Sequence, residues 1–208
     1  MRFFETIEAY KRNDPAARNG LEIVLLYNGF HATFWYWIAH WLWQHHCCFL
    51  ARMISQLTKA CTGVEIHPAA TIGRRFVIDH GTGIVIGATA EVGDDCLLYQ
   101  GVTLGGTGKD TGKRHPTLGN NIMVGSGAKV LGPFKVGDNC RIAANSVVLR
   151  EVPPNCTVVG VPGRIVRQGG EKLDHVHTPD PVMDRIDQLE QKIAMLEAKL
   201  EEKDYETV

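Results

Sequence analysis

Residues 118–148 read LGNNIMVGSGAKVLGPFKVGDNCRIAANSVV, and this stretch decides the fold. An aliphatic residue returns at every sixth position, from Leu118 through Val130 to Val148. A period of six fits neither an α-helix of about 3.6 residues per turn nor one long flat strand. It is typical of a parallel β-helix, in which each short strand contributes one aliphatic side chain to a central stack.

The same spacing extends toward the N-terminus and is broken twice. Aliphatic residues stand at positions 66, 72 and 78, and then at positions 86, 92, 98 and 104. The phase shifts around His80, and a polar excursion separates Gly105 from Thr117. A polar loop that projects from a rigid coil is typical of a functional site, because the scaffold fixes the positions of the loop's residues.

Length and composition indicate one domain with attachments. The chain has 208 residues and a formal net charge of −1, so it lacks the basic surplus of nucleic-acid-binding proteins. Residues 1–10, MRFFETIEAY, have no apolar core and do not form a signal peptide. Charged residues are absent between Glu22 and Ala51, but Asn28, His31 and His40 interrupt that stretch, which disfavours a membrane span. We expect buried helices there that pack against another subunit.

The six cysteines are not arranged as a disulfide framework, and they form no CxxC motif. Cys96 and Cys140 fall where alanine or serine stands in other repeats, which predicts small core-filling side chains rather than catalytic thiols. We therefore expect a reducing, cytoplasmic location.

These patterns divide the chain into segments of an α+β protein. Residues 1–60 are expected to form a helical N-terminal domain, in which Asn13, Asp14 and Pro15 mark a helix start. Residues 61–166 form the β-helix, residues 167–181 a polar linker, and residues 204–208 a tail. Residues 182–203 are predicted to form a coiled-coil-like helix, because its aliphatic residues alternate at spacings of three and four, at Ile186, Leu189, Ile193, Leu196 and Leu200.

His80 and Glu65 are the first candidates for catalysis. They stand fifteen positions apart, which places them on neighbouring strands of a coil with about eighteen residues per turn. A carboxylate next to an imidazole holds one tautomer and stabilises its protonated form, as a general base requires. An ordinary surface pair is the alternative for these two residues, and a helix cap is the alternative for Asp14.

Four segments, in this order, resemble the serine O-acetyltransferase family. They are residues 79–87 (DHGTGIVIG), 100–109 (QGVTLGGTGK), 114–116 (RHP) and 160–166 (GVPGRIV). Residues 13–16 (NDPA) and 29–32 (GFHA) are similar to the helical part of that family. The resemblance covers residues 10–166, and its motifs are more specific than the six-residue repeat alone.

The resemblance implies a left-handed parallel β-helix that assembles as a homotrimer or as a dimer of trimers, with sites between neighbouring coils. It implies an enzyme of cysteine biosynthesis that makes O-acetyl-L-serine from L-serine and acetyl-CoA. His80 would remove the proton of the serine hydroxyl, which attacks the thioester directly, and Glu65 would orient His80. The family often has aspartate at the position of Glu65.

The resemblance also assigns binding residues. Asp14 and Asp79 are expected to bind the substrate ammonium, and Arg114 its carboxylate by a bidentate contact. His115 is expected to help bind serine and to stabilise the developing oxyanion. No metal is implied. Acetyl-CoA is expected to lie along a groove formed by Gly106, Thr107, Ser126, Lys129, Arg141 and Ala144.

Two protein-level interactions follow from the same resemblance. L-cysteine is implied as a feedback inhibitor that competes at the serine site. The family commonly docks a C-terminal tail ending in isoleucine in cysteine synthase. This chain ends in Val208, which is smaller by one methylene or about 0.8 kcal/mol of burial, so docking is expected to be weak or absent.

Three other functions compete with this interpretation. A zinc site of the γ-class carbonic anhydrase type could recruit His67, His80 and His115, although that family's closely spaced histidine pair is absent here. A hexapeptide acetyltransferase for a sugar or an antibiotic shares the coil and a catalytic histidine. A non-enzymatic scaffold that binds a partner is the third.

Overall fold

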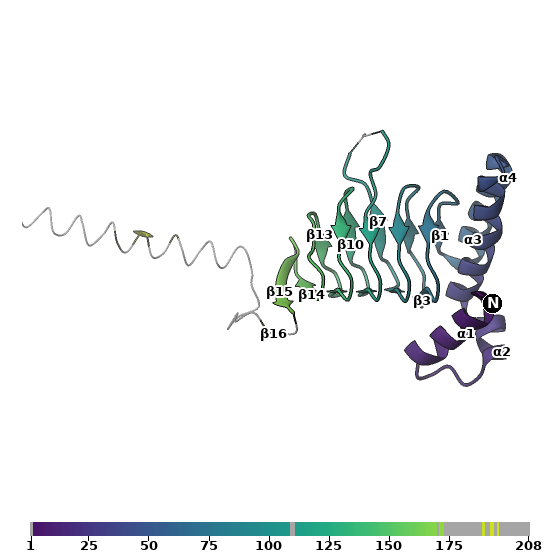
Figure 1. The fold of residues 1–208 in the computed structure, drawn as a ribbon, viewed down its shortest axis with the longest axis horizontal. Helices are drawn as coiled ribbons and strands as arrows, with labels where there is room; N and C mark the ends of the chain where they lie inside the picture. Colours follow the sequence, from purple (N-terminus) through teal and green to yellow (C-terminus); the bar gives the residue numbers. More distant parts are fainter. Residues whose placement is uncertain are drawn as a thin grey trace, which may run out of the picture. The chain divides into compact units, whose positions relative to one another are not determined.

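The computed structural model describes residues 2–108, 111–169 and 171–172, together with residues 189, 192, 193 and 195. The chain divides into two units, Met1–Leu173 and Asp174–Val208. In the first unit, four helices precede a parallel β-helix (Figure 1). The helices are α1 (Arg2–Asn13), α2 (Gly20–Leu26), α3 (Asn28–Gln44) and α4 (Cys48–Thr62).

Each of the first four turns of the β-helix contributes one short strand to each of three sheets. Sheet A contains β1 (Glu65–Ile66), β4 (Val85–Ile86), β7 (Thr103–Gly105), β10 (Lys129–Leu131) and β13 (Val147–Val148). Sheet B contains β2 (Thr71–Ile72), β5 (Glu91–Val92), β8 (Thr117–Leu118) and β11 (Lys135–Val136). Sheet C contains β3 (Val77–Asp79), β6 (Leu97–Tyr99), β9 (Met123–Val124), β12 (Arg141–Ile142), β14 (Cys156–Val159), β15 (Arg164–Gln168) and β16 (Glu171–Lys172).

The pairing of strands explains both breaks in the six-residue spacing. A regular turn of three six-residue repeats is offset by eighteen positions, so that residue 123 pairs with residue 141. The first turn takes twenty, since residue 66 pairs with residue 86, and the turn that carries the polar excursion takes twenty-six, since residue 92 pairs with residue 118. The predicted fold class is confirmed: helices precede a parallel solenoid consistent with a left-handed β-helix.

The aliphatic residues of the predicted repeat form the core of the coil. All of them are buried: Ile66, Ile72, Ile78, Ile86, Val92, Leu98, Leu104, Leu118, Val124, Val130, Val136, Ile142 and Val148. Cys96 and Cys140 are also buried, as predicted, and all six cysteines are free thiols. Burial raises the pKa of the Cys96 thiol to about 11, so it stays protonated and inert at neutral pH.

Helices α3 and α4 cover the end of the coil that begins at β1. Ala32 and Tyr36 of α3 join the core of the coil, and the Tyr36 hydroxyl donates to the carbonyl of Ala70 at 2.6 Å. Ser55 of α4 donates to the carbonyl of Ile66 at 2.6 Å. Such a cover is needed because the first turn of a solenoid has no preceding turn to bury its apolar face.

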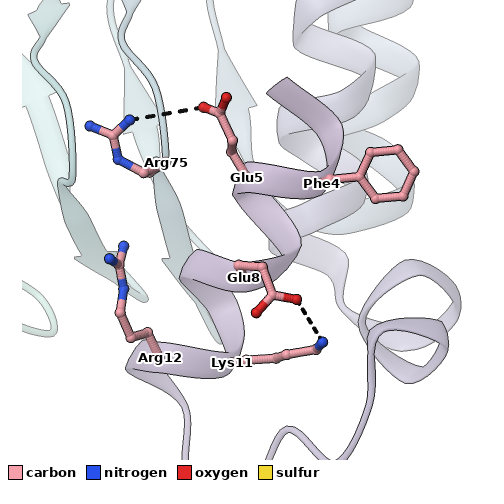
Figure 2. A pocket seen from close by; sticks show the side chains of 6 residues that line it. All are labelled: Phe4, Glu5, Glu8, Lys11, Arg12 and Arg75. Carbon is pink, nitrogen blue, oxygen red and sulfur yellow. Dashed lines mark hydrogen bonds and ion pairs between the residues drawn. The ribbon is translucent and has the colours of Figure 1, made fainter. Parts of the chain in front are cut away.

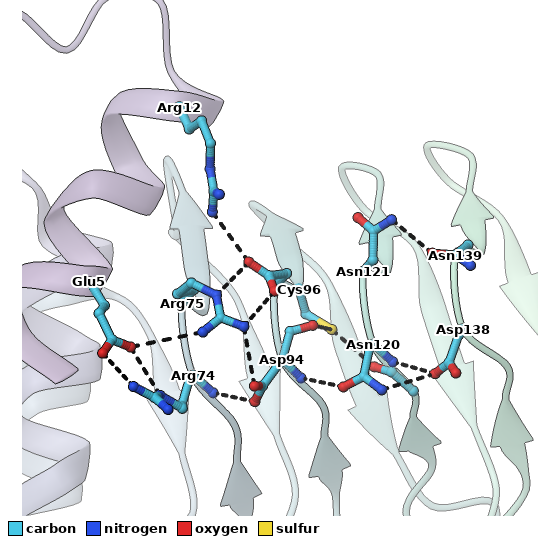
Figure 3. Close-up of polar contacts among 12 residues, drawn as sticks. Glu5, Arg12, Arg74, Arg75, Asp94, Cys96, Asn120, Asn121, Asp138 and Asn139 are labelled. Carbon is cyan, nitrogen blue, oxygen red and sulfur yellow. Dashed lines mark hydrogen bonds and ion pairs between the residues drawn. The ribbon is translucent and has the colours of Figure 1, made fainter. Parts of the chain in front are cut away.

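Polar residues stack along the corner between sheets B and C, which we call the asparagine corner (residues 73–76, 93–96, 119–122 and 137–140). Asn121 donates to Asn139 at 2.9 Å, and Asn139 donates to Asn155 at 3.0 Å. Helix α1 is attached to this corner at the first two turns. Glu5 pairs with Arg74, and Arg12 donates to Asp95 at 3.2 Å (Figure 3).

Two predicted boundaries and one predicted helix start need correction. Asn13 ends α1 instead of starting a helix, because Pro15 cannot continue it, and the next helix begins at Gly20 after the side-chain cap of Asn19. Helix α4 runs slightly beyond the expected boundary at residue 60. The linker expected from residue 167 begins later, because β15 and β16 pair as antiparallel strands.

Other sequence predictions fall on residues that the structure describes only in part. Of the predicted heptad helix, residues 189, 192, 193 and 195 are helical, and the rest of residues 182–203 and the tail 204–208 lie outside the described residues. No described helix is long and apolar enough to cross a membrane. The expected cover of another subunit stays a prediction, because large apolar side chains of α2 to α4, among them Leu26, Trp41 and Phe49, are exposed.

Candidate active site

A cleft opens where sheet C turns into sheet A, beside the end of α1. We call this edge of the coil the His80 corner (residues 80–84, 100–102, 126–128 and 144–146). The cleft has a volume of ≈ 460 Å³. It is lined by Asp14, Ala16, Leu26, Tyr27, Asn28, Ile78, Asp79 and His80. Three candidates from distant parts of the sequence, Asp14, Asp79 and His80, therefore meet at one place.

The imidazole of His80 is exposed while its backbone is held. The residue has a φ of 60°, in the left-handed region, and 73 % of its side chain is accessible. Its carbonyl accepts a hydrogen bond of 2.8 Å from the side-chain amide of Asn28, which also donates to the carbonyl of Thr62. Asp79 Oδ1 lies 3.9 Å from His80 Nε2. The ring is thus positioned by its backbone and free to act on a ligand in the cleft.

Asp14 lies in the turn after α1, and both of its carboxylate oxygens accept hydrogen bonds. Oδ1 accepts from the backbone N–H of Ala16 at 2.8 Å, and Oδ2 accepts from the Tyr27 hydroxyl at 2.6 Å. The bond to the Asp14 carboxylate raises the pKa of Tyr27 to about 12, so the phenol remains a donor at neutral pH. Asp14 therefore caps a turn, rather than a helix as the alternative had it, and also faces the cleft.

Sequence reasoning missed the tyrosines that hold this cleft together. Tyr10 is buried in α1, and its hydroxyl donates to the Ile78 carbonyl at 3.1 Å and accepts from the Ile78 N–H at 3.2 Å. Its ring meets that of Tyr27 edge to face. In the folded chain Tyr10 belongs to an apolar cluster and Tyr27 packs against it. A lone tyrosine ordinarily indicates core packing of this kind, so the sequence carried no signal for a role at the cleft.

Glu65 does not contact His80 within the chain. Its Oε2 lies 2.6 Å from Lys59 Nζ, and no hydrogen bond or ion pair joins it to His80 among the residues described. The reason is the longer first turn, which places Glu65 opposite Val85 inside sheet A, while His80 lies at the preceding corner. The fifteen-residue spacing thus overstated how close the two side chains come.

Arg114 and His115 lie at a different edge of the coil, between sheets A and B. We call this edge the His115 corner (residues 67–70, 87–90, 106–108, 111–116 and 132–134). His115 is buried, and the absence of a side chain at Gly87 makes room for its ring. Desolvation and the nearby charges of Arg114 and Lys113 lower the pKa of His115. The polar excursion therefore presents its residues away from His80.

The candidates for acetyl-CoA are divided between the same two corners. Ser126 and Ala144 lie in later turns of the His80 corner, since β9 and β12 precede them in register. Lys129 of sheet A donates to the carbonyl of Gly101 in that corner. Gly106 and Thr107 directly follow β7 and belong to the His115 corner. The remaining candidate, Arg141, starts β12 in sheet C and lies 3.5 Å from Met123 Sδ.

Residues 115–150 match the family model described as bacterial transferase hexapeptide (six repeats). The serine acetyltransferase of Synechococcus elongatus is 54 % identical over 205 residues, which cover 95 % of this chain and 84 % of that protein. The chain belongs to the serine acetyltransferase family.

Solved structures of serine acetyltransferases share the fold. One, in complex with cysteine, is 44 % identical with a TM-score of 0.79, and the match covers 80 % of this chain and 69 % of the other. The Neisseria gonorrhoeae enzyme in complex with serine is 39 % identical with a TM-score of 0.78, and the match covers 80 % and 68 % of the two chains. As a member of this family, the chain is an acetyl-transferring enzyme.

Two features of this serine acetyltransferase lie apart from its cleft. A hollow of ≈ 500 Å³ on α1 is lined by Phe4, Glu5, Glu8, Lys11, Arg12 and Arg75 (Figure 2). The charged groups of this hollow pair with one another or with the asparagine corner, as in the 2.7 Å contact between Lys11 and Glu8.

Within one chain the histidines of the zinc alternative are not brought together: no cluster of three metal-ligating residues occurs in the described part of the chain, and His80 is at another corner than His67 and His115.

Proposed function

We propose that this chain transfers the acetyl group of acetyl-CoA to the hydroxyl of L-serine, giving O-acetyl-L-serine and CoA in cysteine biosynthesis. The observation that carries the proposal is the cleft that joins Asp14 and Asp79 to an exposed His80. Family membership supports serine as the acceptor over a sugar or an antibiotic. Six free cysteines, three of them exposed, support a reducing cytoplasm as the location.

In the proposed mechanism, His80 acts as the general base. Its neutral imidazole takes the proton of the serine hydroxyl as the oxygen attacks the thioester carbonyl. The tetrahedral intermediate then collapses, the carbon–sulfur bond breaks, and the imidazolium returns the proton to the leaving thiolate. No acyl-enzyme forms. Base assistance of this kind contributes about 10²–10⁴-fold, because an alcohol is a weak nucleophile at neutral pH.

Two carboxylates define the amino-acid end of the cleft. We assign Asp14 and Asp79 to the substrate ammonium, because both line the cleft beside His80 and an ammonium group needs anionic acceptors when it leaves water. Asn28 and Tyr27 hold the two sides of the cleft through hydrogen bonds to His80 and Asp14. The amino group of serine would then lie near Asp14, with its hydroxyl directed toward the imidazole.

Glu65 is assigned by resemblance as the residue that orients His80. Lys59 holds its carboxylate in the single chain, so this role requires that ion pair to open. Glu65→Gln should lower kcat if the role is correct, and an unchanged kcat would remove Glu65 from the mechanism.

The candidate residues for serine lie at two separate corners of the coil, and this supports a site shared between subunits. Strands of sheet A join the His80 corner to the His115 corner, and one six-residue repeat at about 3.3 Å per residue places the middles of the two corners about 20 Å apart. Free serine is too short to span that distance. Arg114 and His115 can therefore reach the serine bound beside His80 only from another copy of the chain. We propose a homotrimer, or a dimer of trimers, in which the two corners of neighbouring coils meet.

Acetyl-CoA would lie in the groove between those two corners. Ser126 and Ala144 would line it from one copy, and Gly106 and Thr107 from the next. Lys129 of sheet A and Arg141 of sheet C, on either side of the His80 corner, would supply positive charge for the phosphates of the cofactor. The chemistry needs no metal, because His80 supplies the proton transfer.

Two regulatory contacts are proposed with the enzyme. L-cysteine carries the same ammonium and carboxylate as L-serine, so it would compete for Asp14, Asp79 and Arg114, and a related serine acetyltransferase has been solved with cysteine. Docking of the tail in cysteine synthase is proposed to be weak, since Val208 offers less apolar surface than isoleucine.

The test measures release of CoA thiol with L-serine, a galactoside and chloramphenicol as alternative acceptors. His80→Ala should lower kcat for serine by about 10²-fold or more without changing the assembly. His46→Ala is the matched control, because His46 is also exposed with a φ of 63° but lies outside the cleft. Near-normal serine acetylation by His80→Ala would refute the assigned base.

A further inference from the structure

Thr89 links the two residues of the polar excursion that are assigned to serine. Its Oγ1 accepts the backbone N–H of Arg114 at 3.0 Å and that of His115 at 3.1 Å. The same oxygen lies 2.8 Å from Nδ1 of the His115 ring. One hydroxyl thus contacts the backbone of both residues and the side chain of one of them.

The donors and acceptors around Thr89 determine the tautomer of His115. A hydroxyl has one proton and two lone pairs. Both lone pairs of Oγ1 are used by the two backbone N–H groups, so its proton is directed to Nδ1. The backbone N–H of Thr89 also donates to Nδ1, at 3.2 Å. Since Nδ1 only accepts, the ring carries its proton on Nε2.

The surroundings of His115 keep that ring neutral. The side chain is buried, and burial is the main cause that lowers its pKa, followed by the positive charges of Arg114 and Lys113. No carboxylate forms an ion pair with the ring among the described residues. A neutral imidazole with its proton on Nε2 donates one hydrogen bond and cannot act as a base through Nδ1 while Thr89 occupies that atom.

A second contact holds the excursion against the same residue. Lys113 Nζ donates to the Thr89 carbonyl at 2.7 Å and to Glu91 Oε1 at 2.8 Å. The three consecutive residues 113–115 are therefore all attached to Thr89, by side chain or by backbone. A loop that leaves the coil between Gly105 and Thr117 would otherwise lack a fixed end next to its functional residues.

We propose that Thr89 is a positioning residue that presents Arg114 and the Nε2–H donor of His115 to the carboxylate and the developing oxyanion of serine. The proposal rests on the proposed function for the identity of the ligand. Its structural half, the tautomer and its cause, does not depend on that function.

The experiment compares Thr89→Val and Thr89→Ser in the full-length enzyme. Valine keeps the shape and removes the hydroxyl, whereas serine keeps the hydroxyl and removes the methyl group. Thr89→Val should lower kcat/KM for serine by about 10- to 100-fold, because two backbone donors and one ring acceptor lose their partner. Thr89→Ser should retain kcat/KM within about threefold, and KM for acetyl-CoA should change little in both.

A spectroscopic readout separates positioning from general damage. In enzyme labelled with ¹⁵N-histidine, with the His115 signals identified by a His115→Asn variant, the wild-type ring should show the Nε2–H tautomer. Thr89→Ser should retain that signal, and Thr89→Val should shift it toward a mixture of tautomers. An Nδ1–H tautomer in the wild-type protein would overturn the proposal even if Thr89→Val failed to fold.

Two further results would also count against Thr89. Equal defects in Thr89→Val and Thr89→Ser would show that packing rather than the hydroxyl matters. Unchanged kinetics in Thr89→Val, while Arg114→Ala raises KM for serine, would show that Thr89 does not position the site. If Arg114→Ala and His115→Ala leave KM for serine unchanged, the proposed function of this corner fails instead, and the spectra still decide the tautomer.

Discussion

At the scale of single residues, the cleft depends on side chains that hold other side chains. Tyr27 directs one oxygen of Asp14, and Asn28 fixes the backbone of His80. Each is a neutral donor to a group with a direct part in the proposed chemistry. We therefore expect a change in either supporting residue to weaken substrate binding, because each holds a group assigned to the proposed chemistry.

Tyr27→Phe should weaken serine binding without affecting the coil. The variant removes the donor to Asp14 Oδ2 and leaves the aromatic packing. Losing this hydrogen bond should cost about 1 kcal/mol of the free energy of serine binding, so KM for serine should rise about fivefold. Steady-state kinetics with serine and with acetyl-CoA measure the effect. Tyr36→Phe is the control, since it loses an equally short bond, to Ala70, far from the cleft and should lower only the melting temperature. Equal KM values for wild-type and Tyr27→Phe enzyme would contradict this role.

At the scale of elements, α1 matters because Asp14 directly follows it. The helix is attached to the coil by Tyr10 on one side and by Glu5 and Arg12 at the asparagine corner on the other. The hydrogen bond from Arg74 is the main cause that lowers the pKa of Glu5. Arg75 similarly lowers the pKa of Asp95. The position of Asp14 is thus coupled to ion pairs that acid can remove.

The contribution of Glu5 should depend on pH in a defined direction. A carboxylate with a lowered pKa in the folded state stabilises the protein fully above its ordinary pKa, 4.5, and loses that contribution as the pH falls below it. Glu5→Gln should therefore lower the melting temperature at pH 7, and the difference from wild type should shrink progressively as the pH falls below 4.5. Glu8→Gln is the control, because Glu8 pairs only within α1, with Lys11. A difference that persists undiminished in acid would exclude the ion pair as its cause.

At the scale of the whole molecule, one chain carries one half of each of two proposed sites. The His80 corner and the His115 corner lie on opposite edges of sheet A, and each holds candidates for serine and for acetyl-CoA. A head-to-tail ring of copies joins unlike edges and closes without leaving a half unused. Exposed apolar residues on α2 to α4 are a further surface that such an assembly could cover.

Mixing two impaired variants tests the shared site. His80→Ala should be nearly inactive alone, and Arg114→Ala should be strongly impaired alone at serine concentrations well below its raised KM. If the chains exchange in an equimolar mixture, about one quarter of the sites of a head-to-tail ring should combine two intact corners and regain activity. The assay is thiol release after co-refolding, with light scattering to confirm trimers. No recovery in a mixture shown to contain mixed trimers would place the complete site within one chain.

Local pattern was enough to predict the coil. Every aliphatic residue of the six-residue repeat is buried, as predicted. The prediction succeeded because each turn of a solenoid contacts only its neighbours, so a short repeat specifies those contacts. His80, Asp79 and Asp14 could be named as candidates for the same reason, since motif spacing along a regular coil and a resemblance to a family are both properties of sequence. The helix start at Asn13 was wrong because a cap signal and a turn signal use the same residues.

The sequence by itself determined the repeat, its two breaks and the residue types at those breaks. Only the tertiary structure decided which of them share an edge of the coil: Asp14 joins His80, while Glu65 pairs with Lys59 and His115 lies with Thr89. The physical reason is that the edge on which a residue falls depends on the length of every preceding turn, and these lengths are twenty, eighteen and twenty-six residues. The hydrogen bonds that select tautomers and orient carboxylates then form between residues far apart in the chain.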